Sequence, residues 1–146
     1  MKSLLVLLSS LLLWSSVQAG PVNTQGWGNN AIEGYDPVAY FTESKPVRGD
    51  SDYSYKWQGA NWRFSSAENR ERFIQNPTAY APQYGGYCAY AVANNYTASI
   101  DPSAWTIVDG KLYLNYSKSV QKTWSRDIPG YIQKGNKHWP ELKETL

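Results

Sequence analysis

The sequence has little of what small cross-linked or metal-binding domains rely on. It contains a single cysteine, Cys88, and a single histidine, His138. One cysteine cannot close an intramolecular disulfide, so a cross-linked framework is excluded. No Cys-x-x-Cys or His-Glu-x-x-His pattern occurs, and neither does a Ser/His/acid set at a recognisable spacing or a phosphate-binding glycine loop. Thioredoxin-like, zinc-protease, serine-hydrolase and nucleotide-binding mechanisms therefore have no motif to support them.

Net charge and long apolar runs are also scarce. Fourteen basic and twelve acidic side chains give a formal net charge of +2. A charge this small does not steer a protein toward nucleic acid or a membrane surface. Beyond the N-terminal region, no run approaches the roughly 20 apolar residues that a membrane span needs. We expect no nucleic-acid partner and no transmembrane segment in the mature chain, and the sequence leaves the oligomeric state open.

The one long apolar run lies at the N-terminus. Lys2 precedes a leucine-rich run from Leu4 to Trp14, and small and polar residues follow as far as Ala19. This order is typical of a secretory signal peptide, and the run is too short for a membrane anchor. We therefore expect residues 1–19 to be a signal peptide cleaved near Ala19, and the mature protein to be periplasmic or secreted.

Aromatic residues are the class present in excess. Seven Trp, twelve Tyr and three Phe make up 15% of the chain. Each buried ring removes roughly 150–250 Å² from water, so ring packing can build a core without disulfides. Residues 20–30 are polar and glycine-rich, which predicts a flexible lead-in. Residues 31–146 fit a single domain.

Two segments have the pattern of β-hairpins. From Tyr53 to Phe64, aromatic residues alternate with polar ones on both sides of a turn at Gly59. Further along, Asp109-Gly110 lies between two β-rich runs and is a favoured two-residue hairpin turn. Each predicted hairpin is followed by a helical pattern. The fold class that we expect is α+β, with small antiparallel hairpins and packed helices.

The other predicted elements rest on capping and breaking signals. Ser65, with Glu68 three residues later, predicts the start of the first helix, and Ser117 predicts a second helix as far as Asp127. Ile128-Pro129-Gly130 predicts a break, with only a short helical piece after it. Val38–Phe41 fits a buried strand. The two halves share an order of elements but no sequence, so the sequence does not indicate a repeat.

Four segments form an ordered set: "GYDPVAYF", "GANWRFSSAENRERFIQNPTAYAPQYGGYCAYAV", "DPSAWTIVDGKLYLNYSKSVQKTW" and "WPEL". This set, which covers residues 32–142, resembles the YHS-domain family in its exported, single-domain bacterial form. The resemblance implies a treble-clef-like fold and a link to metals, chiefly copper. Metal-linked members carry cysteines just after the Asp-Pro-Val motif and around the start of the following helix. The matching positions here have no thiol and hold Ala39, Ser65, Ser66 and Asn69.

Cys88 is the leading candidate for a metal ligand, because a thiolate is the soft donor that selects copper(I). His138 is the other soft or borderline donor, and it lies far along the chain. The alternative is that Cys88 is a small apolar core residue between Tyr87 and Tyr90, with a raised pKa and no reactivity. Both interpretations remain open at the level of sequence.

The aromatic excess also suggests a ligand site. Tyr84, Tyr87, Tyr90 and Trp105 form a candidate cleft for a flat ligand such as haem, although a domain without disulfides needs such rings for its core. Asp36, before a proline, is expected to cap a turn rather than to act in catalysis. We therefore expect an exported, non-enzymatic binding module that binds a metal, with copper as the candidate. The alternative is a small-ligand or protein-interaction domain that uses the aromatic cleft.

Overall fold

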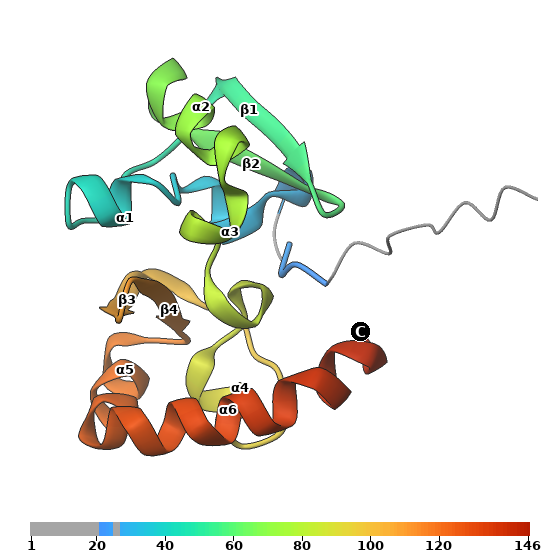
Figure 1. Cartoon of the computed structure of the whole chain (residues 1–146), viewed down its shortest axis with the longest axis vertical. Coiled ribbons are helices and arrows are strands. Elements are labelled where there is room, and N and C mark those ends of the chain that lie inside the picture. The colour runs from blue at the N-terminus through green and yellow to red at the C-terminus, as the bar shows by residue number, and fades with distance from the viewer. Residues whose placement is uncertain (1–20, 25–26) are drawn as a thin grey trace, which may run out of the picture.

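Two antiparallel hairpins organise the structure, a computed structural model that describes residues 21–24 and 27–146 (Figure 1). They form two separate two-stranded sheets, β1 (Asp50–Trp57) with β2 (Ala60–Phe64) and β3 (Asp101–Val108) with β4 (Lys111–Asn115). Helices pack around both sheets, which confirms the predicted α+β class. The predicted signal peptide, residues 1–19, lies outside the described residues.

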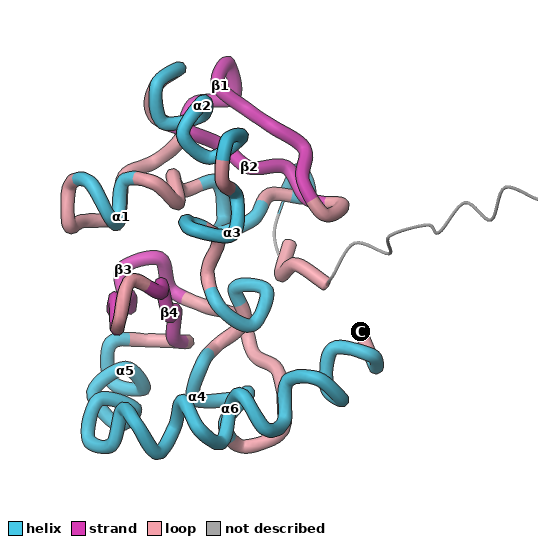
Figure 2. Tube along the Cα trace, in the orientation of Figure 1, coloured by secondary structure: helices cyan, strands magenta, loops and turns pink. Residues whose placement is uncertain are grey.

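The helices are short except for the last (Figure 2). They are α1 (Ala39–Thr42), α2 (Ala67–Gln75), α3 (Pro77–Tyr80), α4 (Ala89–Ala93), α5 (Lys118–Trp124) and α6 (Ile128–Leu142). Short 3-10 turns join them: η1 (Trp27–Asn29), η2 (Ala31–Gly34), η3 (Gln83–Gly86), η4 (Ser125–Asp127) and η5 (Lys143–Thr145). None of the helices described here combines the length and the apolar character needed to cross a membrane.

Both hairpins close through turns whose two central residues have positive φ. The φ values are 50° and 74° at Gln58-Gly59, and 50° and 73° at Asp109-Gly110. Such turns match the right-handed twist of paired strands and fix their register. Trp57 accordingly pairs with Ala60 at the end of the first hairpin. Both predicted hairpins are confirmed. They could be predicted from sequence because the residues of each turn lie next to one another in the chain.

The two hairpins belong to two copies of one structural unit. β1 and β3 have eight residues each, and β2 and β4 have five each. The register of each pair is interrupted at the same place, between Asp50 and Ser54 in one and between Asp101 and Trp105 in the other. In each unit the second strand leads into a helix, α2 or α5. The units lie one above the other in Figure 1.

The backbone before and after each hairpin repeats as well. The turns η2 and η3 each contain two successive left-handed residues, Ile32-Glu33 and Tyr84-Gly85. Ser66 and Ser117 cap α2 and α5, and each side chain accepts a backbone N–H at 3.1 Å. The chain therefore contains an internal structural repeat, η2 to α2 and η3 to α5. The sequence did not indicate it because the repeat preserves turns and caps while the core side chains differ.

In the second unit both faces of β4 are buried, because α6 packs on the side away from the main core. In β2 alternate residues are buried, whereas in β4 every residue from Leu112 to Asn115 is buried. Leu112 and Leu114 face the main core, while Tyr113 faces Trp124 and a second cluster that includes side chains of α6. The helix comes close to this cluster, because a Cβ at Gly135 would lie 2.5 Å from the Tyr84 hydroxyl. The first unit has no counterpart of α6.

Three of the predicted elements were wrong in detail. Val38–Phe41 falls in the helical turn α1 and not in a strand, because the Asp36 carboxyl accepts the Val38 and Ala39 N–H groups and closes the turn. The first helix after a hairpin is capped by Ser66 and not by Ser65. Ile128-Pro129-Gly130 starts a 15-residue helix and does not break one. Proline in a first turn needs no N–H partner, and Asp127 caps this turn by accepting from Gly130.

Described residues of the lead-in, within 21–24 and 27–30, form hydrogen bonds with distant parts of the chain. The Asn23 N–H donates to the Gly85 carbonyl at 2.8 Å, and the Asn23 side chain donates to the Gly86 carbonyl at 3.2 Å. Asn29 donates to the Gly59 carbonyl at 2.7 Å, and Asn30 forms a bridge with a residue of β2. These bonds join residues far apart in sequence, so composition alone does not reveal them.

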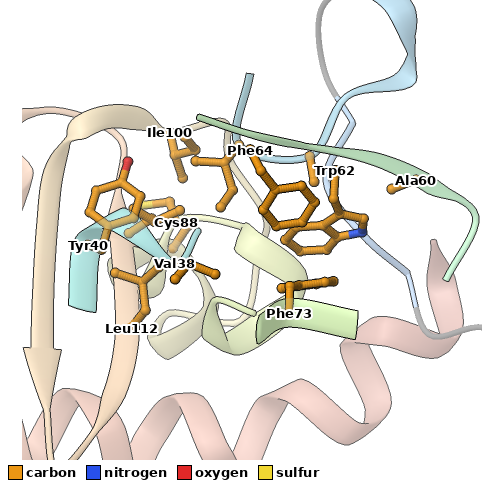
Figure 3. Close-up of a cluster of buried hydrophobic side chains, with 13 residues drawn as sticks. Val38, Tyr40, Ala60, Trp62, Phe64, Phe73, Cys88, Ile100 and Leu112 are labelled. Carbon is orange, nitrogen blue, oxygen red and sulfur yellow. The ribbon is translucent and has the colours of Figure 1, made fainter. Parts of the chain in front are cut away.

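The main core joins the two units. Figure 3 shows Val38, Tyr40, Phe64 and Phe73 of the first unit beside Cys88 and Leu112 of the second, among thirteen core side chains: Ala31, Ile32, Val38, Tyr40, Ala60, Trp62, Phe64, Phe73, Cys88, Ala91, Ile100, Leu112 and Leu114. The Tyr40 hydroxyl crosses between the units and donates to the Pro102 carbonyl at 2.7 Å. The ring of Tyr40 also packs on Trp105 at 5.6 Å between centroids.

Buried tyrosines predict that stability falls at alkaline pH. Burial is the main cause that raises the pKa values of Tyr40 and Tyr84, with nearby groups adding to it. A raised pKa means that the folded state holds the proton more tightly, so this stability is present below the ordinary tyrosine pKa of about 10 and is lost as pH rises above it. Urea unfolding from pH 8 to 11.5, with tyrosinate absorbance, should show these rings ionising only as the protein unfolds.

The variant Tyr40→Phe provides the control for this prediction. It removes one ionisable hydroxyl and the bond to Pro102. Stability at neutral pH should therefore fall by about 1 kcal/mol, and the alkaline slope should become shallower. Stability that stays constant through pH 11.5, or an unchanged slope in the variant, would contradict the prediction.

Candidate functional site

Cys88 lies between η3 and α4, with its sulfur against the end of β4. The Tyr116 N–H donates to the Cys88 Sγ at 3.2 Å, and the thiol in turn points to the Asn115 Oδ1 at 3.6 Å. The side chain is 1% exposed and belongs to the main core (Figure 3). This placement agrees with the interpretation of Cys88 as a buried side chain, and the sulfur also has defined polar neighbours.

Burial raises the pKa of the Cys88 thiol above its ordinary value. Backbone N–H groups of Ala91, Tyr116 and Tyr90 act in the opposite direction with a smaller effect. At neutral pH the side chain is therefore a protonated thiol, which is a poor nucleophile. A ligand that binds through the thiolate has to displace this proton.

A pocket of about 260 Å³ lies over Cys88. We call it the Cys88 pocket; its lining residues are Cys88, Tyr90, Tyr96, Ala98, Tyr116 and Val120. Tyr96 and Tyr116 are 49% and 56% exposed, and they are two of the four large hydrophobic side chains exposed in the described parts of the chain. Exposed aromatic rings beside a pocket are typical of a binding surface.

Asn115, next to Cys88, has an unsatisfied polar group. The side chain is fully buried, and its Oδ1 accepts the Tyr90 N–H at 3.0 Å as well as the Cys88 thiol. Its Nδ2 has no hydrogen-bond partner within residues 21–24 and 27–146. Leaving such a group unpaired costs about 1–3 kcal/mol of folding free energy. The buried Asn115 amide beside Cys88 therefore lowers the stability of the fold.

Asp36 is the counterpart of Cys88 in the first unit. Its Oδ2 accepts the Ser65 N–H, just as the Cys88 Sγ accepts the Tyr116 N–H. The same Oδ2 accepts the Ser65 hydroxyl and the Asn69 amide, all at 2.8 Å. The turn-capping role predicted for Asp36 is confirmed. Ser65 and Asn69, where the YHS resemblance places metal-binding thiols, are therefore engaged in a closed hydrogen-bonded cluster.

The other predicted site residues do not form one cleft. Tyr84 and Tyr87 both pack on Trp139 of α6, at 6.0 and 6.2 Å between ring centroids, while Trp105 packs on Tyr40 of α1. His138 is half-buried on α6 and is not among the residues that line the Cys88 pocket. The pocket thus brings Cys88 and Tyr90 together, without the other predicted residues. No three His, Cys, Asp or Glu side chains within the described ranges could together hold a metal ion.

Sequence reasoning missed Tyr96, Tyr116 and Val120 as members of the site. Tyr116 directly follows β4, and Val120 lies in the first turn of α5. Tyr96 follows Asn95, a left-handed residue at the end of α4. Only the folding of the second unit brings the loop after α4 and the start of α5 to the same place. In the structural repeat, the contact between Cys88 and Tyr116 corresponds to the contact between Asp36 and Ser65. The repeat could therefore have indicated that Tyr116 lies beside Cys88, but it is not visible in the sequence.

Comparison of the chain with protein-family models, curated proteins and solved structures finds no match.

Proposed function

We propose that the protein is an exported, non-enzymatic binding module whose ligand occupies the Cys88 pocket. The observation that carries the proposal is the pocket itself, with a buried thiol at its floor and the exposed rings of Tyr96 and Tyr116 at its rim. A protein without disulfides gains stability by burying its aromatic rings in the core. Two exposed rings at the same pocket therefore favour a role in ligand binding.

The lining favours a small, flat and largely apolar ligand. Tyr90, Tyr96 and Tyr116 offer ring faces, and Ala98 and Val120 offer methyl groups. A cavity of roughly 150 Å³ accepts benzene, so the 260 Å³ here accommodates one ring with a small attached or fused group, as in indole. Haem is larger than this cavity, and the pocket would hold only its edge. Hydroxyl groups of the tyrosines supply the directional bonds that such sites use for specificity.

Copper(I) is a second candidate, supported by the resemblance to the YHS family and by the soft donor at Cys88. The residues at the pocket do not complete such a site by themselves. They supply one sulfur, burial raises the pKa of its thiol, and His138 lies outside the lining. A copper ion here would need a second donor from a small molecule, so the ring ligand is the proposal that the geometry supports better.

The test uses indole as the probe and NMR as the readout, on the purified full chain. Indole should shift the Tyr116 amide and the Ala98 methyl resonances. The variants Tyr96→Ala and Tyr116→Ala should each weaken its binding roughly three- to tenfold, the effect of one aromatic contact. Ile74→Ala, which truncates an exposed side chain on α2, is the matched control and should bind as the parent does.

A parallel titration with copper(I), against a competing chelator, separates the two candidates. High copper(I) affinity that disappears in Cys88→Ser, in a protein whose Tyr116 and Ala98 resonances do not respond to indole, would favour copper. If indole leaves the resonances of Tyr116 and Ala98 unchanged and copper(I) affinity does not depend on Cys88, the pocket is not a binding site and the proposal is overturned.

A further inference from the structure

We propose a second ligand site, separate from the Cys88 pocket, that binds a single planar ring carrying a carboxylate. It is a cavity of about 240 Å³ where the lead-in, the tip of the first hairpin and the C-terminal end of α6 meet. These three segments lie on the same side of the molecule in Figure 1. We call it the tryptophan pocket, after Trp57, Trp62 and Trp139 in its lining.

The walls of the tryptophan pocket are held rigidly. The Trp62 Nε1–H donates to the Trp57 carbonyl at 3.0 Å, and the two indoles meet edge to face at 5.6 Å between centroids. Trp139 is held from the far side by the rings of Tyr84 and Tyr87. Walls fixed before binding lower the entropy that a ligand must give up, which is a property of built sites.

The lead-in forms another wall, and the glycines of η3 let it approach. Pro21 and Val22 line the pocket, and Asn23 anchors them through its bonds to the carbonyls of Gly85 and Gly86. Gly85 has a φ of +62°, and a Cβ there would collide with the Pro21 carbonyl. Glycine is therefore required at this point for the pocket wall to close.

The charge of the lining indicates an anionic ligand. Lys143 is its one charged side chain, and no aspartate or glutamate lines the cavity. Within the described ranges the one ion pair joins Arg72 and Glu68, so Lys143 has no carboxylate partner there. The Gln58 side chain adds an amide group beside the indoles. It sits at a turn position with φ of 50°, which Asn, Asp or Gly would occupy at lower cost.

Size limits the ligand further. A benzene ring fits a cavity of roughly 150 Å³, so 240 Å³ holds one ring and a small substituent but little more. The partly exposed indoles of Trp57 and Trp139 suit the ring, and the buried Trp62 packs against Trp57 from behind. The Lys143 ammonium and the Gln58 amide suit a carboxylate. The same features distinguish this pocket from the Cys88 pocket, which contains no charged side chain.

The experiment compares benzoate with benzamide, which has nearly the same shape and no charge. Tryptophan fluorescence and calorimetry on the full chain should show benzoate binding at least fivefold more tightly than benzamide, with the difference shrinking as salt is added. Lys143→Gln should reduce benzoate affinity to the benzamide level. Lys137→Gln, on the exposed face of α6, is the matched control and should change nothing.

Further variants make the outcome decisive. Cys88→Ser should leave benzoate binding unchanged, which separates this site from the Cys88 pocket and from the function proposed for it. Absence of benzoate binding, equal affinity for benzoate and benzamide, or full affinity in Lys143→Gln would each overturn the proposal. Lys143 is partly exposed just beyond the end of α6. A thermal melt of Lys143→Gln that matches the parent shows that its loss of binding does not reflect unfolding.

Discussion

Replacing Asp36 with alanine should lower the free energy of unfolding by about 3–5 kcal/mol, a large part of the roughly 5–15 kcal/mol that a domain has. The side chain is fully buried, and its two oxygens accept five hydrogen bonds. Alanine would leave the N–H and hydroxyl donors of Ser65 without their acceptor, and the Asn69 amide would keep only its longer bond to the Ser65 hydroxyl, at 3.4 Å. It would also remove the bond that closes the turn at Val38. Guanidinium unfolding followed by fluorescence measures the effect.

Two further variants show whether the geometry of the carboxyl group matters. Asp36→Asn keeps the size of the side chain but turns an NH2 group toward donors, so it should also destabilise the fold, by less than alanine. Asp50→Asn changes an exposed aspartate whose oxygen accepts one backbone N–H at 2.9 Å, and its effect should stay within about 0.5 kcal/mol. Equal stability of Asp36→Ala and Asp50→Asn would contradict the importance of the cluster.

Phe73→Ala should have an effect of similar size, about 3–5 kcal/mol. Phe73 is fully buried, and its ring lies 4.9 Å from Trp62, 5.2 Å from Phe64 and 5.6 Å from Trp57 between centroids. Removing it leaves a cavity under three rings that a short helix cannot close. Because one cysteine allows no disulfide, no cross-link offsets the loss. Near-ultraviolet circular dichroism should show these aromatic rings losing their fixed packing.

The neighbouring residue and a milder substitution serve as controls. Phe73→Leu keeps much of the volume and should cost about 1–2 kcal/mol. Ile74→Ala truncates the next side chain along α2, which is 37% exposed, and should cost about 1 kcal/mol or less. If Phe73→Ala costs no more than Ile74→Ala, aromatic packing is not what stabilises this protein.

The sequence predicted the parts of the fold that depend on near neighbours. Asp109-Gly110 adopts the two positive φ angles that its hairpin turn requires, and no distant contact is needed for that choice. The caps at Ser66 and Asp127 are equally local, yet the first was placed one residue early, at Ser65, and Asp127 was overlooked because Pro129 suggested a break. A proline in the first turn after a cap, such as Pro129, fits the start of a helix, because its missing N–H needs no partner there. A helix can also continue past a proline, as α6 does at Pro140.

The candidate sites were less accessible to sequence reasoning, because each is built from segments distant in the chain. Cys88 was chosen for its chemistry, and the structure gives it a pocket, but the partners Tyr96 and Tyr116 come from loops without a shared motif. Tyr84 and Trp105 were chosen for their aromatic character, and they pack on different helices. Aromatic composition predicts that rings pack together, and it does not predict which rings meet.

The structural repeat places different chemistry at equivalent positions. In the first unit the carboxyl of Asp36 accepts five hydrogen bonds, while in the second the thiol of Cys88 has two polar neighbours and lines a pocket. The Asn115 beside Cys88 keeps an Nδ2 that is unpaired within the described residues. The first unit is therefore fully hydrogen-bonded at this position, and the second is not.

The tryptophan pocket joins residues from the two ends of the described chain, Pro21 and Val22 at one end and Trp139 and Lys143 at the other. Each hairpin closes through its own turn and needs neither pair. The cavity therefore depends on an alignment of distant segments that the hairpins do not require, and a change that displaces either segment should abolish the cavity while both hairpins remain folded.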